Sequence, residues 1–443
     1  MSPLLPLTQS RRRFLGNTAT AFGALVASGC MTQRRAGGSV SADNLYGPLQ
    51  PDPAGLLDLP RGFTYRVLSR LDDAMDDGER VPDKADGMGC FALADGRIAL
   101  VRNHELNQRD KAGGVLKIGY GRDPHGVVLP GGTTNIVLDP GTLKVERQFR
   151  SLAGTIRNCS GGTTPWGSWL TCEEPGDRLL PVALDHGYVF EVPAAASGLV
   201  DPVPLKAMGR FNHEAACVDP ATGIVYMTED RDDGVLYRFV PRTPSRLGDG
   251  GRLQALVLAN GVRDSRNWDT PGVAVGQPLE ARWIDLRDVE APKDDLRLRA
   301  AADGALLVAR GEGIHWGRDE VYICSTSGGA AKLGQIFKLT PGRGGAPDRL
   351  ELFFESTSPD QFNYGDNLTV APNGHLIVCE DQYTPIVDNH LRGITPDGQP
   401  YAFGRLRMQT ELAGGCFSPD GRWFFVNAYS PTVTFAVTGP WLA

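Results

Sequence analysis

Apolar residues along this chain occur in short runs, and glycine, proline, aspartate and asparagine separate the runs from one another. This pattern is typical of β-strands joined by tight turns, whereas helical periodicity is scarce. One unit, a turn followed by a β-rich apolar run, recurs at residues 92–105, 163–174, 219–230, 315–329, 371–381 and 418–429. A unit repeated in this way predicts an all-β fold assembled from equivalent sheets.

The spacing of the repeated units indicates a propeller. Their turn glycines are mostly farther apart than the about 40–45 residues of a compact blade, so we expect insertions between blades. The widest interval, between Gly223 and Gly317, contains the charged segment 241–298. We predict a six-bladed β-propeller with inter-blade insertions, because ring closure protects the sheet edges of a long all-β chain. Two β-sandwich domains are the alternative, but no linker-like composition interrupts residues 59–441.

The N-terminus carries an export signal. Residues 10–15, with the sequence Ser-Arg-Arg-Arg-Phe-Leu, match a twin-arginine motif, and the apolar stretch at residues 19–27 is too short to remain as a membrane span. An ordinary secretory signal is the alternative, but the paired arginines before Phe-Leu favour twin-arginine export. We therefore expect the mature protein in the periplasm or outside the cell.

The signal is followed by two further segments. We predict a signal peptide in residues 1–30, a polar, flexible tether in residues 31–58 and the propeller domain in residues 59–443. Cys30 ends an Ala-Ser-Gly-Cys sequence that resembles a lipoprotein cleavage site, which leaves lipidation and simple cleavage nearby as two alternatives. A lipid on Cys30 would be the only link to a membrane, because no later segment has the length and apolarity of a transmembrane helix.

Composition narrows the range of functions. The net charge of −7 offers no basic footprint, which excludes a nucleic-acid partner. Heptads are absent, so we expect a monomer. The eight cysteines form no CxxC pairs, which argues against structural zinc. Cys172, Cys324 and Cys379 lie in apolar runs and suit packing, whereas Cys159 lies in a polar, glycine-rich loop.

Adjacent acids end three of the repeated units, at Glu173–Glu174, Glu229–Asp230 and Glu380–Asp381. Equivalent strands of a propeller end at one place, and carboxylates gathered there need cations to offset their repulsion. For any single acid a solvated turn is the simpler interpretation, but the repetition favours a metal site. The candidate metal ligands are Glu105, Cys159, Glu173, Glu174, Glu214, Glu229, Asp230, Glu312, Asp366, Asn367, Glu380 and Asp381.

The candidate ligands differ in the metals that they suit. Carboxylate and amide oxygens suit calcium, whereas the thiolate of Cys159 suits a softer or redox-active metal, for which iron is the natural choice beside many carboxylates. Arg310 lies two residues before Glu312, where it could neutralise that acid or bind an anionic substrate such as a phosphate ester. No Gly-x-Ser-x-Gly motif is present, so a serine hydrolase has little support.

Segments spread over nearly the whole chain after residue 59 resemble the PhoX-type alkaline phosphatases. The most specific block runs from Asn158-Cys159-Ser160-Gly161-Gly162 to Thr171-Cys172-Glu173-Glu174. The other matching segments are residues 86–89, 102–105, 165–167, 209–211, 213–215, 226–230, 366–368, 379–381, 417–421 and 438–441. The resemblance implies a secreted phosphomonoesterase of broad substrate range on a six-bladed propeller.

The resemblance also implies a pair of ferric ions, Fe(III), surrounded by several calcium ions, Ca²⁺. By match, Cys159 would be the thiolate ligand to iron, and Arg310 would hold the phosphate of the substrate. The carboxylate ligands shared among iron and calcium would be Glu174, with Glu173 as its alternative, and Glu214, Glu229 and Glu312.

Two other functions remain as alternatives. The protein could be a calcium-stabilised binding propeller without turnover, which would need calcium but no redox-active metal at Cys159. It could also be a calcium-dependent lactonase or esterase, which would need neither Cys159 as a ligand nor Arg310 as an anion-binding group. Characterised phosphatases of the PhoX type tend to be longer chains, so insertions that shape substrate access could differ in this one.

Overall fold

The computed structural model describes residues 45–175, 180–382 and 384–441. The twin-arginine motif, Cys30 and the first part of the predicted tether lie outside the described residues. The described secondary structure is almost entirely β, and α1 (Leu296–Ala302) is the only α-helix in these ranges. Two short 3-10 helices cover Lys206–Met208 and Leu247–Asp249. The prediction of an all-β fold is confirmed.

The strands pair with antiparallel neighbours in successive sheets. One four-stranded sheet contains β4 (Ala85–Ala92), β5 (Ile98–His104), β6 (Gly131–Leu138) and β7 (Val145–Thr155). The next sheet contains β8 (Asn158–Thr163), β9 (Ser168–Glu173) and β10 (Val189–Pro193). The last four-stranded sheet contains β26 (Leu412–Phe417), β27 (Phe424–Ala428), β28 (Val433–Thr438) and β3 (Thr64–Arg70). Because β3 pairs with β28, a strand from the N-terminal part of the described chain completes the sheet formed by the last three strands.

Larger sheets complete the arrangement. One contains β11 (His213–Val218), β12 (Val225–Glu229), β14 (Tyr237–Pro241), β15 (Gly251–Leu258), β16 (Pro278–Asp285), β21 (Asp348–Glu355), β20 (Gln335–Thr340), β19 (Val321–Ser325) and β18 (Gly311–Trp316). Another contains β22 (Gly365–Val370), β23 (Leu376–Glu380), β24 (His390–Ile394), β25 (Pro400–Leu406), β2 (Leu57–Pro60) and β1 (Leu49–Gln50). A small pair joins β13 (Gly234–Val235) to β17 (Leu307–Val308).

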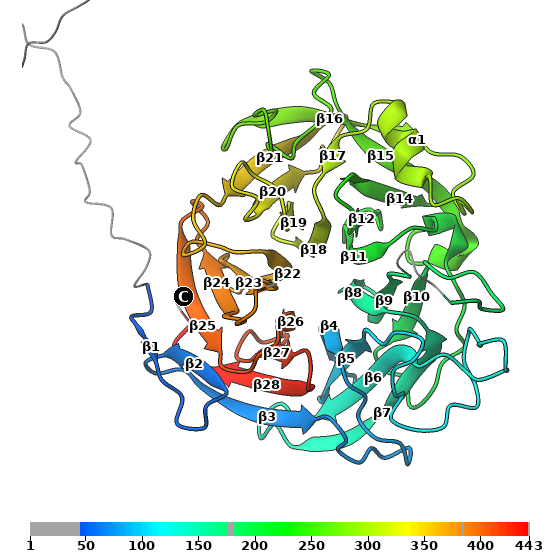
Figure 1. The fold of residues 1–443 in the computed structure, drawn as a ribbon, viewed down its shortest axis with the longest axis vertical. Coiled ribbons are helices and arrows are strands. Elements are labelled where there is room, and N and C mark those ends of the chain that lie inside the picture. The colour runs from blue at the N-terminus through cyan, green and yellow to red at the C-terminus, as the bar shows by residue number, and fades with distance from the viewer. Residues whose placement is uncertain (1–44, 176–179, 383, 442–443) are drawn as a thin grey trace, which may run out of the picture. The chain divides into compact units, whose positions relative to one another are not determined.

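The sheets stand around a common axis as in a propeller (Figure 1). The strands nearest this axis, which we call the inner strands, are β4, β8, β11, β18, β22 and β26, and β11 and β18 are the two edge strands of the nine-stranded sheet. Each inner strand contacts the next, and β26 contacts β4, so the described inner strands close a ring. The strand that follows each inner strand, here called the second strand, is β5, β9, β12, β19, β23 or β27.

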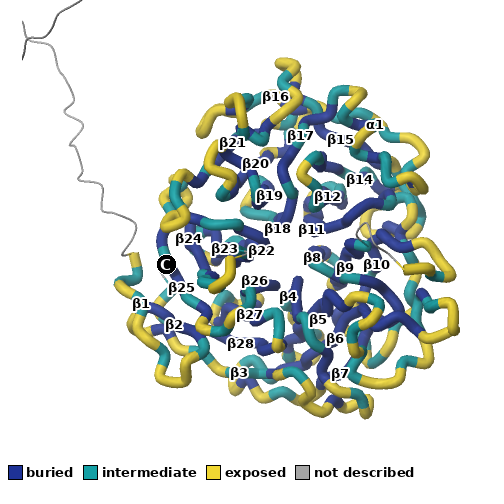
Figure 2. The backbone as a smooth tube through the Cα atoms, viewed as in Figure 1, coloured by how far each residue is buried: buried dark blue, intermediate teal, exposed yellow. Residues whose placement is uncertain are grey.

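Apolar side chains from both faces of each sheet pack against neighbouring sheets. Leu100 on β5 packs with Phe425 of the sheet on one side, while the adjacent Val101 packs with Trp169 of the sheet on the other side. Successive strand residues point to opposite faces, which explains why the apolar runs are continuous rather than alternating. Each fully buried aliphatic side chain stabilises the fold by about 1.5–3 kcal/mol. Exposed residues gather in the peripheral loops (Figure 2).

The C-terminal part of the predicted tether belongs to the sheet structure. β2 pairs with β25, and β1 pairs with β2. Asp52 also accepts hydrogen bonds from the backbone of Leu56 and from the hydroxyl of Tyr65. The sequence placed residues 45–58 in a flexible segment, but these bonds tie them to the fold. Over the described ranges, no helix combines the length and the apolarity that crossing a membrane would take.

Candidate metal centre

Every inner strand has a β-bulge near its start, where its pairing register with the second strand shifts. Two residues of each strand lie within the shift. The first of the two is Asp86, Cys159, Glu214, Glu312, Asp366 or Gly414. Because a bulge re-aims its side chains, equivalent bulges bring a thiol and four carboxylates to one end of the inner strands.

The second residue of the bulge is glycine, serine or alanine in five of the six inner strands, and it is Asn367 in β22. A Cβ atom added at Gly87 would lie 2.5 Å from the Cα atom of Ser160, and one added at Gly313 would lie 2.6 Å from the backbone nitrogen of Leu368. Both contacts are with a neighbouring inner strand, so larger side chains would force the ring apart. At Gly87 and Gly313 the sequence therefore places a glycine after the bulge acid, where a neighbouring inner strand lies close.

A second set of acids comes from the residues that directly follow the second strands. Glu105 follows β5, Glu174 follows β9, Asp230 follows β12 and Asp381 follows β23. Glu105, Glu174 and Asp381 are buried, and Asp230 is half-buried. Because side chains alternate along a strand, the acid that precedes Glu174, Asp230 or Asp381 points elsewhere.

Glu173 shows where these preceding acids lie. It is fully buried, and its carboxylate accepts hydrogen bonds from His186 at 2.6 Å and from the backbone nitrogens of Gly187 and Ile156 at 2.8 and 2.9 Å. These partners belong to the segments before β8 and β10. Glu173 therefore fastens loops of its own sheet, although the sequence analysis placed it among the candidate metal ligands.

Glu380 and Glu229 occupy the equivalent positions in other sheets. The carboxylate of Glu380 accepts hydrogen bonds from Arg392 at 2.7 Å and from the backbone nitrogen of His390 at 3.0 Å. Glu229 accepts a hydrogen bond from the hydroxyl of Tyr237 at 2.8 Å, and its other oxygen is buried without a hydrogen-bond partner among the described residues. Both acids therefore contact the third strand of their sheet or the loop before it.

One cluster of potential ligand atoms, here called the cysteine cluster, contains Glu105, Cys159 and Glu174. Their ligand atoms all lie within 4.8 Å of one another. Arg157 bridges the two acids, because its Nη2 lies 2.6 Å from Oε1 of Glu105 and 2.5 Å from Oε2 of Glu174. The thiol of Cys159 also donates to Asp86 over 3.6 Å. A thiol and carboxylates at this separation fit a metal that accepts both sulfur and oxygen.

A second group, here called the carboxylate cluster, contains Glu214, Glu312 and Asp366. All three are buried, and their ligand atoms also lie within 4.8 Å of one another. Both carboxylate oxygens of Glu214 are buried without a hydrogen-bond partner among the described residues. Burying a carboxylate without partners is costly, and a cation would supply the missing interaction. These residues therefore fit a hard, oxygen-preferring metal ion.

The ionisation of these acids shows how crowded they are. Burial, followed by repulsion from Asp366, Glu174 and Asp86, raises the pKa of Glu214 well above its usual range, and a contact with the Cys159 thiol opposes this only in part. The two clusters are thus neighbours.

Three other acidic groups follow the same trend. Burial and then Asp230 raise the pKa of Glu312 well above its usual range. Burial and then Asp381 raise the pKa of Asp366 to about 7, and burial and then Asp230 raise the pKa of Glu174 to about 8. Without a cation burial and mutual repulsion favour the protonated forms of these groups, and a bound cation would favour the ionised forms.

Arg310 lies between the two sets of acids. Its Nε and Nη2 donate to the two oxygens of Asp230 at 2.7 and 3.1 Å, and Nη2 also donates to Glu312 at 2.8 Å. The side chain is 22% exposed. Asp230 therefore sets the plane of the guanidinium, and the side chain stays partly exposed beside the two sets of acids.

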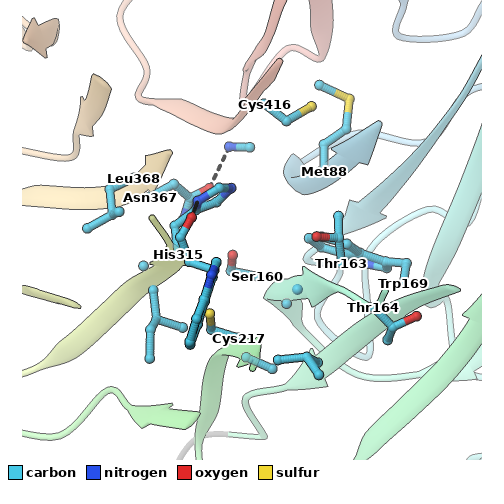
Figure 3. Close-up of a pocket in the computed structure, with 18 of the residues that line it drawn as sticks. Met88, Ser160, Thr163, Thr164, Trp169, Cys217, His315, Asn367, Leu368 and Cys416 are labelled. Carbon is cyan, nitrogen blue, oxygen red and sulfur yellow. Dashed lines mark hydrogen bonds between the residues drawn. The ribbon is translucent and has the colours of Figure 1, made fainter. Parts of the chain in front are cut away.

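The interior of the ring continues beyond the bulges as a cavity of about 270 Å³, to which every inner strand contributes lining residues. Figure 3 shows Met88, Cys416 and Trp169 around it, with Asn367 on one wall. The amide of Asn367 donates to Asp366 at 3.0 Å and accepts from the backbone of Gly414 at 2.5 Å. Asn367, a candidate ligand by sequence, thus orients a neighbouring acid beside the cavity.

Four residues near the clusters were missed by the search for acid pairs. Asp86 contacts Cys159, Arg157 bridges the cysteine cluster, Tyr429 donates to Glu105, and Glu411 is a half-buried acid whose pKa is raised by desolvation and then by Asp381. One sequence signal was available for Arg157, since it precedes Cys159 by two residues, just as Arg310 precedes Glu312. Asp86 also precedes a small residue, as do Glu214 and Glu312.

Comparison with solved structures identifies the same fold elsewhere. Pseudomonas fluorescens PhoX in complex with vanadate, a transition state analogue, matches with a TM-score of 0.67 and 20% identity over 87% of this chain and 96% of that chain. A gluconolactonase from Xanthomonas campestris matches with a TM-score of 0.41 and 15% identity over 89% and 98% of the two chains, a likeness too weak to bear on function. No curated protein sequence matches the chain significantly.

The sequence matches the model of one protein family, described as alkaline phosphatase PhoX, over residues 44–137 and 130–432. The match extends from the strands beside the N-terminal end of the described chain to β27, and it includes both clusters and both bridging arginines. The resemblance noted from the sequence is confirmed, and this chain belongs to the PhoX alkaline phosphatase family.

Proposed function

We propose that this protein is a metal-dependent phosphomonoesterase that acts on small-molecule phosphate esters. The observation that carries the proposal is the pair of neighbouring clusters beside Arg310 in a chain of the PhoX family. A family relative with the same fold holds vanadate, a transition state analogue, which agrees with a site built for phosphoryl transfer. A binding propeller would need no guanidinium presented beside its metal ligands.

The donor sets support different metals. We assign the cysteine cluster to iron, because a thiolate beside carboxylates suits a softer, redox-active ion. We assign the carboxylate cluster to a second ferric ion and to calcium, because its donors are oxygen atoms alone. Bound metal ions would offset the carboxylate charge and act as Lewis acids toward the phosphate oxygens.

The residues of the chain would divide the remaining tasks. Arg310 binds the phosphate through a guanidinium that Asp230 holds in one plane, which suits bidentate contact with phosphate oxygens. Burial of Glu214 and Glu312 keeps water from the ligand set and strengthens electrostatic interactions there. Glu173, Glu229 and Glu380 would act by positioning the strand ends that carry the facing acids. Glu229 is the one that could still reach a cation, because its Oε1 accepts no hydrogen bond among the described residues and lies 3.8 Å from Nη1 of Arg297.

Other parts of the sequence analysis also remain proposals. Six blades are supported by the closed ring of inner strands and by the bulge that recurs in each. The twin-arginine motif supports export to the periplasm or beyond, and Cys30 is the proposed site of a lipid anchor. We propose that the protein is a monomer.

Elemental analysis tests the function most directly. Protein purified after export without chelators should contain iron and calcium and should hydrolyse phosphomonoesters. Removing the metals with a chelator should abolish turnover, and adding back iron and calcium should restore it. Calcium without iron, together with no turnover, would contradict the proposal and favour the binding propeller or the calcium-dependent lactonase.

A further inference from the structure

Arg157 and Arg310 occupy equivalent places in two different sheets. Each directly precedes an inner strand, β8 or β18, and each has a positive φ, 44° for Arg157 and 48° for Arg310. The backbone nitrogen of Arg157 donates to the carbonyl of Leu106 at 3.0 Å, and that of Arg310 donates to the carbonyl of Arg231 at 2.9 Å. Both acceptors lie two residues beyond the end of a second strand. The backbones of the two arginines therefore occupy equivalent positions with equivalent hydrogen bonds.

The side chains follow the same rule. Arg310 reaches Asp230, the acid after β12, which is the second strand of the preceding repeat. Arg157 reaches Glu105, the acid after β5, and also Glu174 after β9. The two arginines share no carboxylate partner in these pairs, yet both lie close enough to Glu174 to influence its pKa, which is raised first by burial. They therefore approach the centre from different sides.

Arg157 retains donors for an incoming anion. Both of its ion pairs use Nη2, whereas Nε is buried without a hydrogen-bond partner among the described residues. Its side chain is 31% exposed, compared with 22% for Arg310. Because a guanidinium carries five N–H donors in a fixed fork, one that uses a single nitrogen on its own acids can still bind another carboxylate or phosphate.

We propose that Arg157 is a second anion-binding residue, which binds a further anionic group on the alcohol part of the substrate while Arg310 binds the reacting phosphate. This inference rests on the proposed phosphomonoesterase function. The preferred substrates are then phosphomonoesters whose leaving alcohol carries a carboxylate or a second phosphate. Arg157 acts on affinity and selectivity, and the chemical step is the same for all substrates.

A matched pair of substrates tests the assignment with the metal-loaded enzyme. Phenyl phosphate and the carboxyphenyl phosphates, with the carboxylate in the ortho, meta or para position, differ by one anionic group. Arg157→Ala should raise KM for at least one carboxyphenyl phosphate about tenfold or more, because a charge-assisted pair is lost, and should change KM for phenyl phosphate less than about twofold. Arg157→Lys keeps the charge but loses the forked guanidinium. Its KM for the carboxyphenyl phosphate should lie between that of the wild type and that of Arg157→Ala.

Binding without turnover gives a second readout. Calorimetry with phenylphosphonate and the matching carboxyphenylphosphonate should show the same selective loss in Arg157→Ala, with iron and calcium content unchanged. Arg252→Ala is the matched control, because Arg252 pairs with Asp285 on the surface and its side chain is 63% exposed. This variant should behave as wild type toward both ligands.

The possible outcomes separate the two proposals. Equal effects of Arg157→Ala on both substrates, loss of iron from that variant, or no effect at all would overturn the assignment of Arg157, because its role would then be to hold Glu105 and Glu174. If the metal-loaded wild type neither hydrolyses phenyl phosphate nor binds phenylphosphonate, the phosphomonoesterase proposal itself fails, and this inference fails with it.

Discussion

The cysteine cluster and the carboxylate cluster are built on the same scaffold and differ in chemistry. Each takes its central residue from a β-bulge on an inner strand and lies beside an arginine that directly precedes such a strand. In the cysteine cluster the bulge residue is a half-buried thiol, and Arg157 bridges both acids. In the carboxylate cluster all three members are buried acids, and Glu312 contacts Arg310.

The difference shows how little must change to alter the metal preference of a repeated fold. The backbone supplies equivalent positions, and one side chain at each bulge decides whether the ligand atom offered to a metal is sulfur or oxygen. The number of nearby arginine contacts then decides how much negative charge remains for a cation to offset. The carboxylate cluster, with Glu214 unpaired, should depend more strongly on its metal than the cysteine cluster does.

Replacing the unpaired acid should have the largest effect. Glu214→Gln removes a carboxylate that has no hydrogen-bond partner among the described residues, so the carboxylate cluster should lose its metal and phosphatase activity should fall more than about a hundredfold. The metal-free variant should be at least as stable as metal-free wild type, because the repulsion with Asp366 is relieved. Elemental analysis, activity assays and thermal melts check both parts, and retention of all metals would contradict the assignment.

Cys159→Ser tests the other cluster. Loss of the thiolate should remove iron and its visible absorption and should lower activity about a hundredfold, while calcium at the carboxylate cluster is kept. Cys90→Ser is the control, since Cys90 packs against the apolar core and the acid that acts on it electrostatically is Asp420, which belongs to neither cluster. An unchanged visible spectrum in Cys159→Ser would rule out a bond between this sulfur and iron.

Arg310→Ala separates substrate binding from metal binding. We expect kcat/KM for phosphomonoesters to fall about a hundredfold, since one preorganised donor group to the transition state is lost, while iron and calcium content stay the same. Steady-state kinetics and elemental analysis on one preparation measure both. Unaltered kinetics, or loss of metal together with activity, would contradict the proposed role of Arg310.

Replacing Glu173 or Glu174, which are adjacent in the sequence, should have different effects on stability and on iron content. Glu173→Gln should lower the free energy of unfolding by about 1–3 kcal/mol, because a buried, hydrogen-bonded carboxylate is altered, while iron content is kept. Glu174→Gln should lower iron content with less effect on the fold. Denaturant unfolding and elemental analysis of the two variants test this, and iron loss from Glu173→Gln alone would reverse the assignment.

The pH dependence of the metal-free protein should be the smallest effect. The pKa of Asp366 is raised to about 7 and that of Glu174 to about 8, from ordinary values of 3.8 and 4.5, first by burial. The folded state therefore binds these protons more tightly than the unfolded state. Proton binding thus contributes to the stability of the folded state, and this stabilisation is complete below about pH 4 and is lost as the pH rises to about 8. Chelator-treated protein should lose several degrees of melting temperature across this window, and the metal-loaded protein should not.

Several features of the site followed from local sequence. Adjacent acids after equivalent strands indicated that carboxylates would gather, and the structure does bring Glu105, Glu174, Glu214, Glu312 and Asp366 into two neighbouring clusters with Cys159. Their assignment to particular metals stays a prediction. The acid pairs could not be resolved from sequence, because a strand end and the residue after it look alike when the bulge and the pairing register are unknown.

The sequence by itself determined the all-β class, the repetition of one sheet unit and the membership of the PhoX family, because apolar runs, turn residues and motif blocks are local properties of the chain. Only the tertiary structure decided that Glu173 turns into its own sheet while Glu174 faces the centre, and that Arg157 is the counterpart of Arg310. The physical reason is that side-chain direction depends on register and bulges, which are set where strands distant in sequence pack around a common axis.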